Sequence, residues 1–252
     1  MAVRALRLGV VLLLLTANGA ARAASAVPSP PAAAPACPDA GEYAASEAPL
    51  PALAAALRSG APVEILAVGS ASTAAAEGYP QRMLAALRAA RPGAAFRLTV
   101  QGARGLQADQ TLALLRAALH AGRTPLVLWQ VGTVDAVRGL RPEALADALE
   151  AGAADVTAQG GDLVLIDPQY SRFLEANVDL DPYQRVIASV AAQSGVVLFH
   201  RFALMRDWAD AGTLDLERAA PKERAAVAAR LADCVGAALA RFVLSGAGAD
   251  RR

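Results

Sequence analysis

Residues 63–73 read VEILAVGSAST, an apolar run followed by a turn of small residues. Four more apolar runs of similar length occur along the chain, at Phe96–Val100, Pro125–Gln130, Asp162–Asp167 and Val196–Phe199. These runs are apolar almost throughout and do not alternate with polar residues, as parallel strands covered on both faces require. We therefore expect five buried strands, of which the first spans Val63–Val68 and is bounded by Gly69.

Longer stretches with helical spacing alternate with these runs. They are Tyr79–Ala90, Leu106–Ala121, Pro142–Gln159, Pro182–Ser194 and Pro221–Phe242. Regular alternation of strands and helices requires right-handed crossovers. The sequence thus predicts a three-layer α/β/α domain with a doubly wound, parallel, five-stranded sheet. In such sheets a ligand binds beyond the carboxyl ends of the strands.

The N-terminus has the pattern of a secretory signal. Arg4 and Arg7 precede a short apolar stretch, Leu8–Thr16, and small residues suited to cleavage follow at Ala21–Ala26. The apolar stretch is much shorter than the roughly 20 residues of a spanning helix. We expect a signal peptide over 1–23, a Pro/Ala-rich arm over 24–49, the folded domain over 50–245 and a tail over 246–252. A retained amphipathic anchor is the alternative to cleavage. With cleavage, the protein is periplasmic or secreted and has no stable transmembrane anchor.

Charge and cysteine content restrict the partners. The formal net charge is +1 and aromatic residues make up 4% of the chain, so a nucleic-acid-binding surface is not expected. The two cysteines, Cys37 and Cys234, are expected to form a disulfide in an oxidising compartment. No third ligand clusters with them, which disfavours zinc, and no motif indicates a cofactor.

Four short blocks occur in order at the predicted strand ends: Gly69–Thr73, Gln101–Gly105, Trp129–Asp135 and Asp215–Arg218. Together they resemble the serine, glycine, Gly-x-Asn-Asp and Asp-x-x-His blocks of the SGNH (GDSL-type) hydrolases, over roughly 63–242. The resemblance implies a flavodoxin-like fold and ester hydrolysis by a serine, a histidine and an aspartate. In that mechanism, backbone N–H groups and an asparagine amide stabilise the oxyanion.

Three matched positions hold residues that do not suit this chemistry. The nucleophile position falls on Ala71, the asparagine position on Val134 and the histidine position on Arg218. A methyl group cannot attack a carbonyl and valine donates no hydrogen bond. An arginine stays protonated and cannot act as a base.

Two elements of the family pattern survive. The aspartate position holds Asp215, and the glycine donor is best matched by Gly105, with Gly102 a close alternative. Near Asp215 the alignment has few anchors. Arg218 lies three residues after Asp215, so it can form a local ion pair or bind an anionic group.

Other residues could replace the missing groups. Ser70 and Ser72 flank Ala71, and His200 follows the fifth strand at the ligand edge. The hypothesis is that His200 acts as a displaced base on one of these serines. The alternatives are turn or helix-capping roles for the hydroxyls and a half-buried strand-end position for the histidine.

The same edge offers polar groups for a ligand, namely Gln130, Asp135, Asp167, Gln169, Tyr170 and Arg172. These groups could equally satisfy backbone groups at the strand ends. Trp129 and Trp208 could stack on a sugar, although burial in the core is the commoner fate of such residues.

The leading hypothesis is an exported SGNH-type protein that lacks the conventional Ser-His-Asp mechanism. It would bind a small-molecule or glycan ester, as an accessory module for an acylated glycan or an envelope component. The alternative is an active esterase with a rearranged site that uses Ser70 or Ser72 and His200. A structural envelope protein is a third reading. The sequence does not set the oligomeric state.

Overall fold

The computed structural model describes residues 36–192 and 196–249. The expected signal peptide and residues 24–35 of the expected arm lie outside the described residues. Residues from Ala36 onward belong to one compact unit.

The predicted five-stranded sheet is confirmed. Its strands are β1 (Val63–Gly69), β2 (Phe96–Gly102), β3 (Leu126–Gln130), β4 (Asp162–Ile166) and β5 (Val196–Phe199). All pair in parallel, in the order β2-β1-β3-β4-β5, which is the flavodoxin-like order. Every residue of β3 and β4 is buried, as their apolar sequences require.

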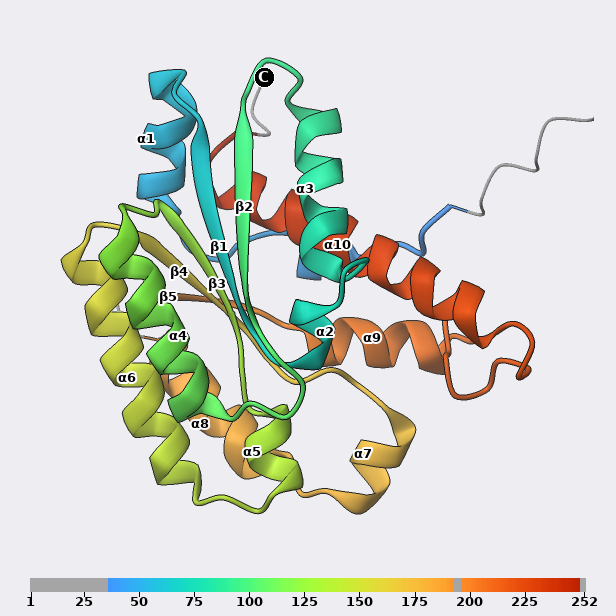
Figure 1. The fold of residues 1–252 in the computed structure, drawn as a ribbon. Coiled ribbons are helices and arrows are strands. Elements are labelled where there is room, and N and C mark those ends of the chain that lie inside the picture. The colour runs from blue at the N-terminus through green and yellow to red at the C-terminus, as the bar shows by residue number, and fades with distance from the viewer. Residues whose placement is uncertain (1–35, 193–195, 250–252) are drawn as a thin grey trace, which may run out of the picture. The chain divides into compact units, whose positions relative to one another are not determined.

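Long helices cover both faces of the sheet (Figure 1). One face carries α4 (Ala108–Ala121), α6 (Pro142–Ala158) and α8 (Asp181–Ala191). The other carries α3 (Tyr79–Ala90), packed against α10 (Arg224–Gly246). The predicted three-layer α/β/α architecture is therefore confirmed. The bounds of these helices lie within four residues of the expected ones, apart from the expected end of α8 at residue 194, which lies outside the described residues.

Two of these contacts depend on glycine. A Cβ on Gly236 of α10 would come within 2.6 Å of the Met83 backbone nitrogen in α3. A Cβ on Gly152 of α6 would meet the Trp129 ring. Both helix contacts are therefore closer than a larger residue would allow.

Several short elements were not expected from the sequence. They are a 3₁₀ helix, η1 (Gly41–Ala44), and the helices α1 (Pro51–Ser59), α2 (Ala71–Ala74), α5 (Thr133–Val137), α7 (Arg172–Asn177) and α9 (Arg201–Asp210). Four of these helices, α2, α5, α7 and α9, follow the carboxyl ends of β1, β3, β4 and β5. They set the positions of the polar residues at that edge.

None of the helices within residues 36–192 and 196–249 has the length and apolar character needed to cross a membrane.

The predicted disulfide between Cys37 and Cys234 is present, with 5.3 Å between the two Cα atoms. It fixes the described part of the N-terminal segment to α10. Two hydrogen bonds support this attachment: Arg230 donates to the Ala36 carbonyl at 2.8 Å, and Trp208 donates to the Asp39 carbonyl at 2.8 Å.

We predict that removing the disulfide with Cys37→Ser/Cys234→Ser lowers the stability markedly. The bridge joins residues 197 positions apart, so its loss releases chain entropy worth about 5 kcal/mol in the unfolded state. For a domain of this size, Tm should fall on the order of 10 °C. Calorimetry with and without reductant measures this fall. Reductant should lower the Tm of the parent protein and leave the double variant unchanged, and an equal Tm for both proteins without reductant contradicts the prediction.

Candidate functional site at the carboxyl edge of the sheet

The turn after β1 is held by a buried amide. Ser70 caps α2, and both its backbone N–H and its hydroxyl donate to the Gln130 Oε1 atom at 3.2 Å. Ser70 and Gln130 are both buried. The Ser70 hydroxyl proton is therefore directed at an amide oxygen, which is not a base that can remove it.

Thr73 closes the same turn from the other side. Its hydroxyl lies 2.9 Å from the Tyr79 hydroxyl and is fully buried. Burial raises the pKa of Tyr79 above its usual value, against the opposing effects of Arg201 and Thr73. A Cβ on Gly69 would collide with the Thr73 side chain, so glycine is needed at the end of β1. These contacts leave Ala71 exposed as the first residue of α2.

The two candidate glycines differ in their surroundings. Gly102 pairs with Gly69 across β2 and β1, and a Cβ there would overlap the Gly69 carbonyl. Gly105 has φ +80°, a left-handed conformation that favours glycine. Val134 lies half-buried in α5, after the β3 turn.

Arg201 is the most unusual residue at this edge. It is the first residue of α9 and only 5% exposed. Its guanidinium donates to the Ser72 hydroxyl at 3.2 Å and to the Gln169 Oε1 atom at 3.3 Å. The guanidinium also lies over the Tyr79 ring, 5.0 Å from the ring centroid. Its Nε atom is buried and has no hydrogen-bond partner. Burial lowers the pKa of Arg201, while Tyr79 and Asp167 oppose that shift.

Asp167 fixes the start of α9, the helix that begins at Arg201. Its carboxylate accepts the backbone N–H of Phe202 at 2.8 Å, so it caps the first turn of α9. Burial raises the pKa of Asp167 to about 7, although the Phe202 N–H and the Arg201 charge act in the opposite direction. Asp167 therefore changes its charge close to neutral pH.

His200 lies beside Asp167 and has no hydrogen bond to either candidate serine among the described residues. Its Nδ1 atom is 4.0 Å from the Asp167 Oδ2 atom, and its side chain is about half exposed. The hydroxyls of Ser70 and Ser72 instead contact Gln130 and Arg201. A displaced base at His200 stays a prediction that these contacts do not support.

Asp215 anchors the segment before α10. Its carboxylate accepts from the Arg172 Nε at 2.9 Å and from the backbone N–H groups of Glu217 and Arg218. Burial alone would raise the pKa of Asp215, but these hydrogen bonds outweigh it and the pKa is lowered. The Arg218 side chain is exposed, with its Nε atom 3.7 Å from the Asp215 carboxylate. The local ion pair between these two residues is therefore present.

Several of the expected ligand-binding residues bond within the protein instead. Asp135 accepts the backbone N–H of Ala108 at 3.0 Å, which fixes the start of α4, and burial raises the pKa of Asp135. Tyr170 donates to Glu175, while Arg172 is held by Asp215. The Asp135 contact is to the backbone at a helix start, and the Tyr170 and Arg172 contacts are to side chains.

Both tryptophans belong to the core. Trp129 is fully buried and donates to the Thr111 hydroxyl at 3.0 Å. Trp208 is also buried. Neither ring is available to stack on a sugar.

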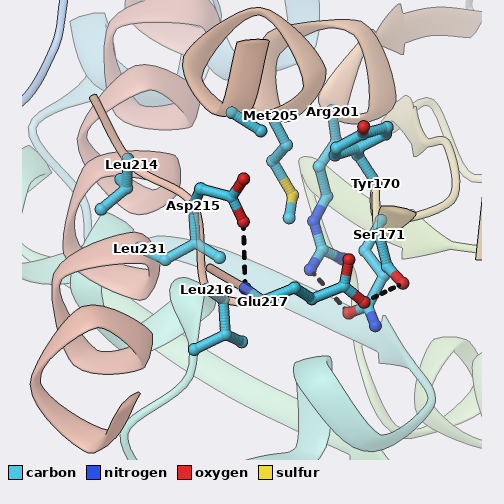
Figure 2. A pocket seen from close by; sticks show the side chains of 11 residues that line it. Tyr170, Ser171, Arg201, Met205, Leu214, Asp215, Leu216, Glu217 and Leu231 are labelled. Atoms are coloured by element: carbon cyan, nitrogen blue, oxygen red, sulfur yellow. Dashed lines mark hydrogen bonds between the residues drawn. The ribbon is translucent and has the colours of Figure 1, made fainter. Parts of the chain in front are cut away.

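Two pockets meet at Arg201 and Gln169. The first has a volume of about 220 Å³ and lies beside the segment that leads to α10. Figure 2 shows Arg201 reaching into it from α9, with Asp215 and Glu217 contributed by that segment. The second, of about 410 Å³, lies between α10 and the start of α3. It is lined by Ser72, Ala75, Glu77, Gly78, Tyr79, Gln169, Arg201, Leu216, Ala228, Ala229, Leu231, Ala232 and Val235.

Arg201 was not among the site residues predicted from the sequence. The signal that could have found it is a charged residue one position after the His200 strand end, at the edge where ligands bind. No helix was expected after β5. The sequence therefore gave no sign that helix α9 would bring the Arg201 side chain into contact with Ser72. Tyr79 was assigned only to a helix start.

The fold and this edge define an α/β protein of the SGNH-hydrolase type. The chain belongs to the Non-GDSL lipase-like family, whose model matches residues 36–249. A search of curated proteins found no match.

Solved structures share the fold. TesA is 24% identical, with 67% of this chain and 95% of that chain covered at a TM-score of 0.51. A variant of Axe2, an acetyl xylan esterase from Geobacillus stearothermophilus, is 16% identical, with 74% and 94% covered at a TM-score of 0.59. AlinE4, an SGNH-hydrolase family esterase, is 21% identical, with 60% and 80% covered at a TM-score of 0.50. The predicted resemblance to SGNH hydrolases is therefore confirmed at the level of family and fold.

We predict that Asp167 makes stability depend on pH. Because its folded pKa is about 7, against about 3.9 in an unfolded chain, the folded state holds the extra proton between these values. Stability is then lost as the pH rises from about 4 to about 8. Asp167→Asn keeps an oxygen for the Phe202 N–H and abolishes the titration. Urea unfolding between pH 4 and pH 8 should show the variant gaining stability relative to the parent protein as the pH rises.

The matched control is Asp147→Asn, at an exposed carboxylate on α6. Its stability profile should run parallel to that of the parent protein. A constant difference between Asp167→Asn and the parent over this pH range contradicts the assignment.

Proposed function

We propose that this protein binds an acylated ligand at the carboxyl edge of its sheet and does not hydrolyse esters by the serine mechanism. The observation that carries the proposal is the chemistry around the two candidate serines. Ser70 donates to an amide oxygen and Ser72 accepts from a guanidinium. Neither partner can take up a proton from a hydroxyl.

The remaining family positions support the same conclusion. Ala71 carries no nucleophile, and the Asp215 carboxylate is engaged by Arg172 and two backbone N–H groups. Loss of the nucleophile alone costs about a million-fold in a comparable triad enzyme. The edge nevertheless keeps two pockets, one of which has the volume of a small-molecule site.

The proposed setting is the periplasm or the exterior of the cell, where the protein acts as an accessory module for an acylated glycan or another envelope component. The Cys37–Cys234 disulfide fits an oxidising compartment. The signal-like pattern at the N-terminus supports export. The fold shared with an acetyl xylan esterase makes an acylated glycan a ligand worth testing first.

We predict that a fluorophosphonate probe leaves the purified, folded mature protein unlabelled, because no base activates a serine. Intact mass spectrometry measures the labelling, and peptide mapping locates any modified residue. Stoichiometric labelling at Ser70 or Ser72 overturns the proposal and favours the rearranged esterase.

Two variants make this result specific. Ser70→Ala/Ser72→Ala removes both candidate hydroxyls, and His200→Ala removes the candidate base. Hydrolysis of p-nitrophenyl acetate and butyrate should proceed at the same background rate with the parent protein and with both variants. A rate that falls on removal of either group assigns that group to catalysis.

A further inference from the structure

We propose that the larger pocket binds a carboxylate with an apolar tail, such as a medium-chain fatty acid, with the carboxylate on Arg201 and the tail along α10. This inference rests on the proposed binding function in placing a ligand at the same edge, and it goes beyond that function by assigning a free acid in place of an acylated ligand. It differs from what the fold alone suggests, since the ligand is an acid and not an ester.

The first argument is the uncompensated charge of Arg201. The side chain is about 95% buried, yet no carboxylate of the described residues lies within 4.0 Å of its guanidinium. Its two hydrogen-bond acceptors, Ser72 and Gln169, are neutral. Buried charges are ordinarily paired, so this site lacks an anion.

The second argument is the number of free donors. An arginine has five N–H donors, and only two of those of Arg201 are used. The Nε atom has no partner. The fork of a guanidinium matches a carboxylate bidentately, and an ester oxygen or a hydroxyl uses it less completely.

Asp167 does not supply the missing anion. It is the acid whose charge acts on Arg201, but its carboxylate is turned to the Phe202 backbone N–H. Burial also raises the pKa of Asp167 to about 7, which weakens its negative charge at neutral pH. The guanidinium also lies over the Tyr79 ring, 5.0 Å from the ring centroid.

The charged residues of the two pockets favour the larger pocket for an anionic ligand. In the smaller pocket, the carboxylates of Asp215 and Glu217 would repel an anion. In the larger pocket, the acidic residue is Glu77, which pairs with Arg82 at 2.7 Å and is mostly exposed. Arg201 therefore dominates the charge of the larger pocket.

The wall of the larger pocket suits a hydrocarbon tail. The residues that α10 and the preceding segment contribute are all apolar: Leu216, Ala228, Ala229, Leu231, Ala232 and Val235. The alanines leave space that longer side chains would fill, and the volume is about 410 Å³. This volume falls within the range of small-molecule sites, about 300–1,000 Å³.

Titration calorimetry with decanoate and decanol, below their aggregation limits, tests the proposal. The two ligands share a tail and differ in charge. We expect decanoate to bind the parent protein at least about 10-fold more tightly than decanol, because charged hydrogen bonds discriminate by that factor or more. Arg201→Gln should weaken decanoate binding at least about 10-fold and leave decanol binding nearly unchanged.

The matched control is Arg206→Gln, which removes an exposed arginine from the same helix and should leave decanoate affinity within about two-fold. Ala229→Trp fills the apolar wall at an exposed position and leaves Arg201 in place. It should weaken both ligands, and it remains informative if Arg201→Gln does not fold.

Equal affinities for decanoate and decanol overturn the proposal, as does no binding of decanoate to the parent protein. Unchanged decanoate affinity in folded Arg201→Gln also overturns it. These failures are distinct from failure of the proposed function, because only serine labelling or variant-sensitive hydrolysis contradicts the latter. A protein that is unlabelled and does not bind decanoate keeps its non-hydrolytic role and loses this ligand.

Discussion

The central strands are buried on both faces, and this constraint determines where polar chemistry can occur. Strands β3 and β4 have no exposed residue between their ends, so polar groups can be held only beyond the strands. At the carboxyl edge, these polar groups also accept hydrogen bonds from backbone N–H groups at the starts of helices. Gln130 holds the turn before α2, and Asp167 caps α9. Asp135 fixes the start of α4.

Arg201 departs from this pattern of mutual satisfaction. The polar groups around it are paired with one another or with the backbone, but its charge faces neutral acceptors and an aromatic ring. Burial of an unpaired charge lowers stability, so such a group is more readily explained by binding than by folding. The same edge that holds a serine nucleophile in the hydrolase family would here hold an anion.

Residues predicted for the family's catalytic positions make contacts that support the structure. Asp215, which would orient a histidine, instead anchors Arg172 and the segment before α10. Ser70 and Gln130 fix the turn that would present a nucleophile. Shared fold and family do not by themselves establish an activity.

Much of the fold could be predicted from the sequence, because it depends on patterns that are local. Continuous apolar runs identified all five strands, and Tyr79–Ala90 matched α3 at both ends. The disulfide could be predicted because the chain has only two cysteines and was expected in an oxidising compartment. The short helices could not be predicted in this way. Helix α2 has four residues and α9 has a weak apolar pattern, and both depend on tertiary contacts.

The candidate site was predicted only in its location. The sequence placed Gln130, Asp167 and Gln169 at the carboxyl edge of the sheet, since Gln130 ends a strand and the other two follow one. It could not show which polar groups would be consumed by internal hydrogen bonds, because those partners are distant in the chain. Asp215 is bound by a residue 43 positions away. Ser72 and Arg201 are 129 positions apart, so a buried guanidinium held by neutral partners could not be recognised.

The most direct test of the account is the pKa of the bound ligand's own carboxyl group. Carboxyl-¹³C decanoate can be followed by NMR in complex with the protein as the pH is lowered. We predict that the pKa of the bound carboxyl group lies at least about one unit below the pKa of free decanoate, because a guanidinium in contact with it stabilises the anion. If the pKa of the bound carboxyl group is equal to or higher than that of free decanoate, the carboxylate does not lie against Arg201. That result would contradict the proposed binding mode.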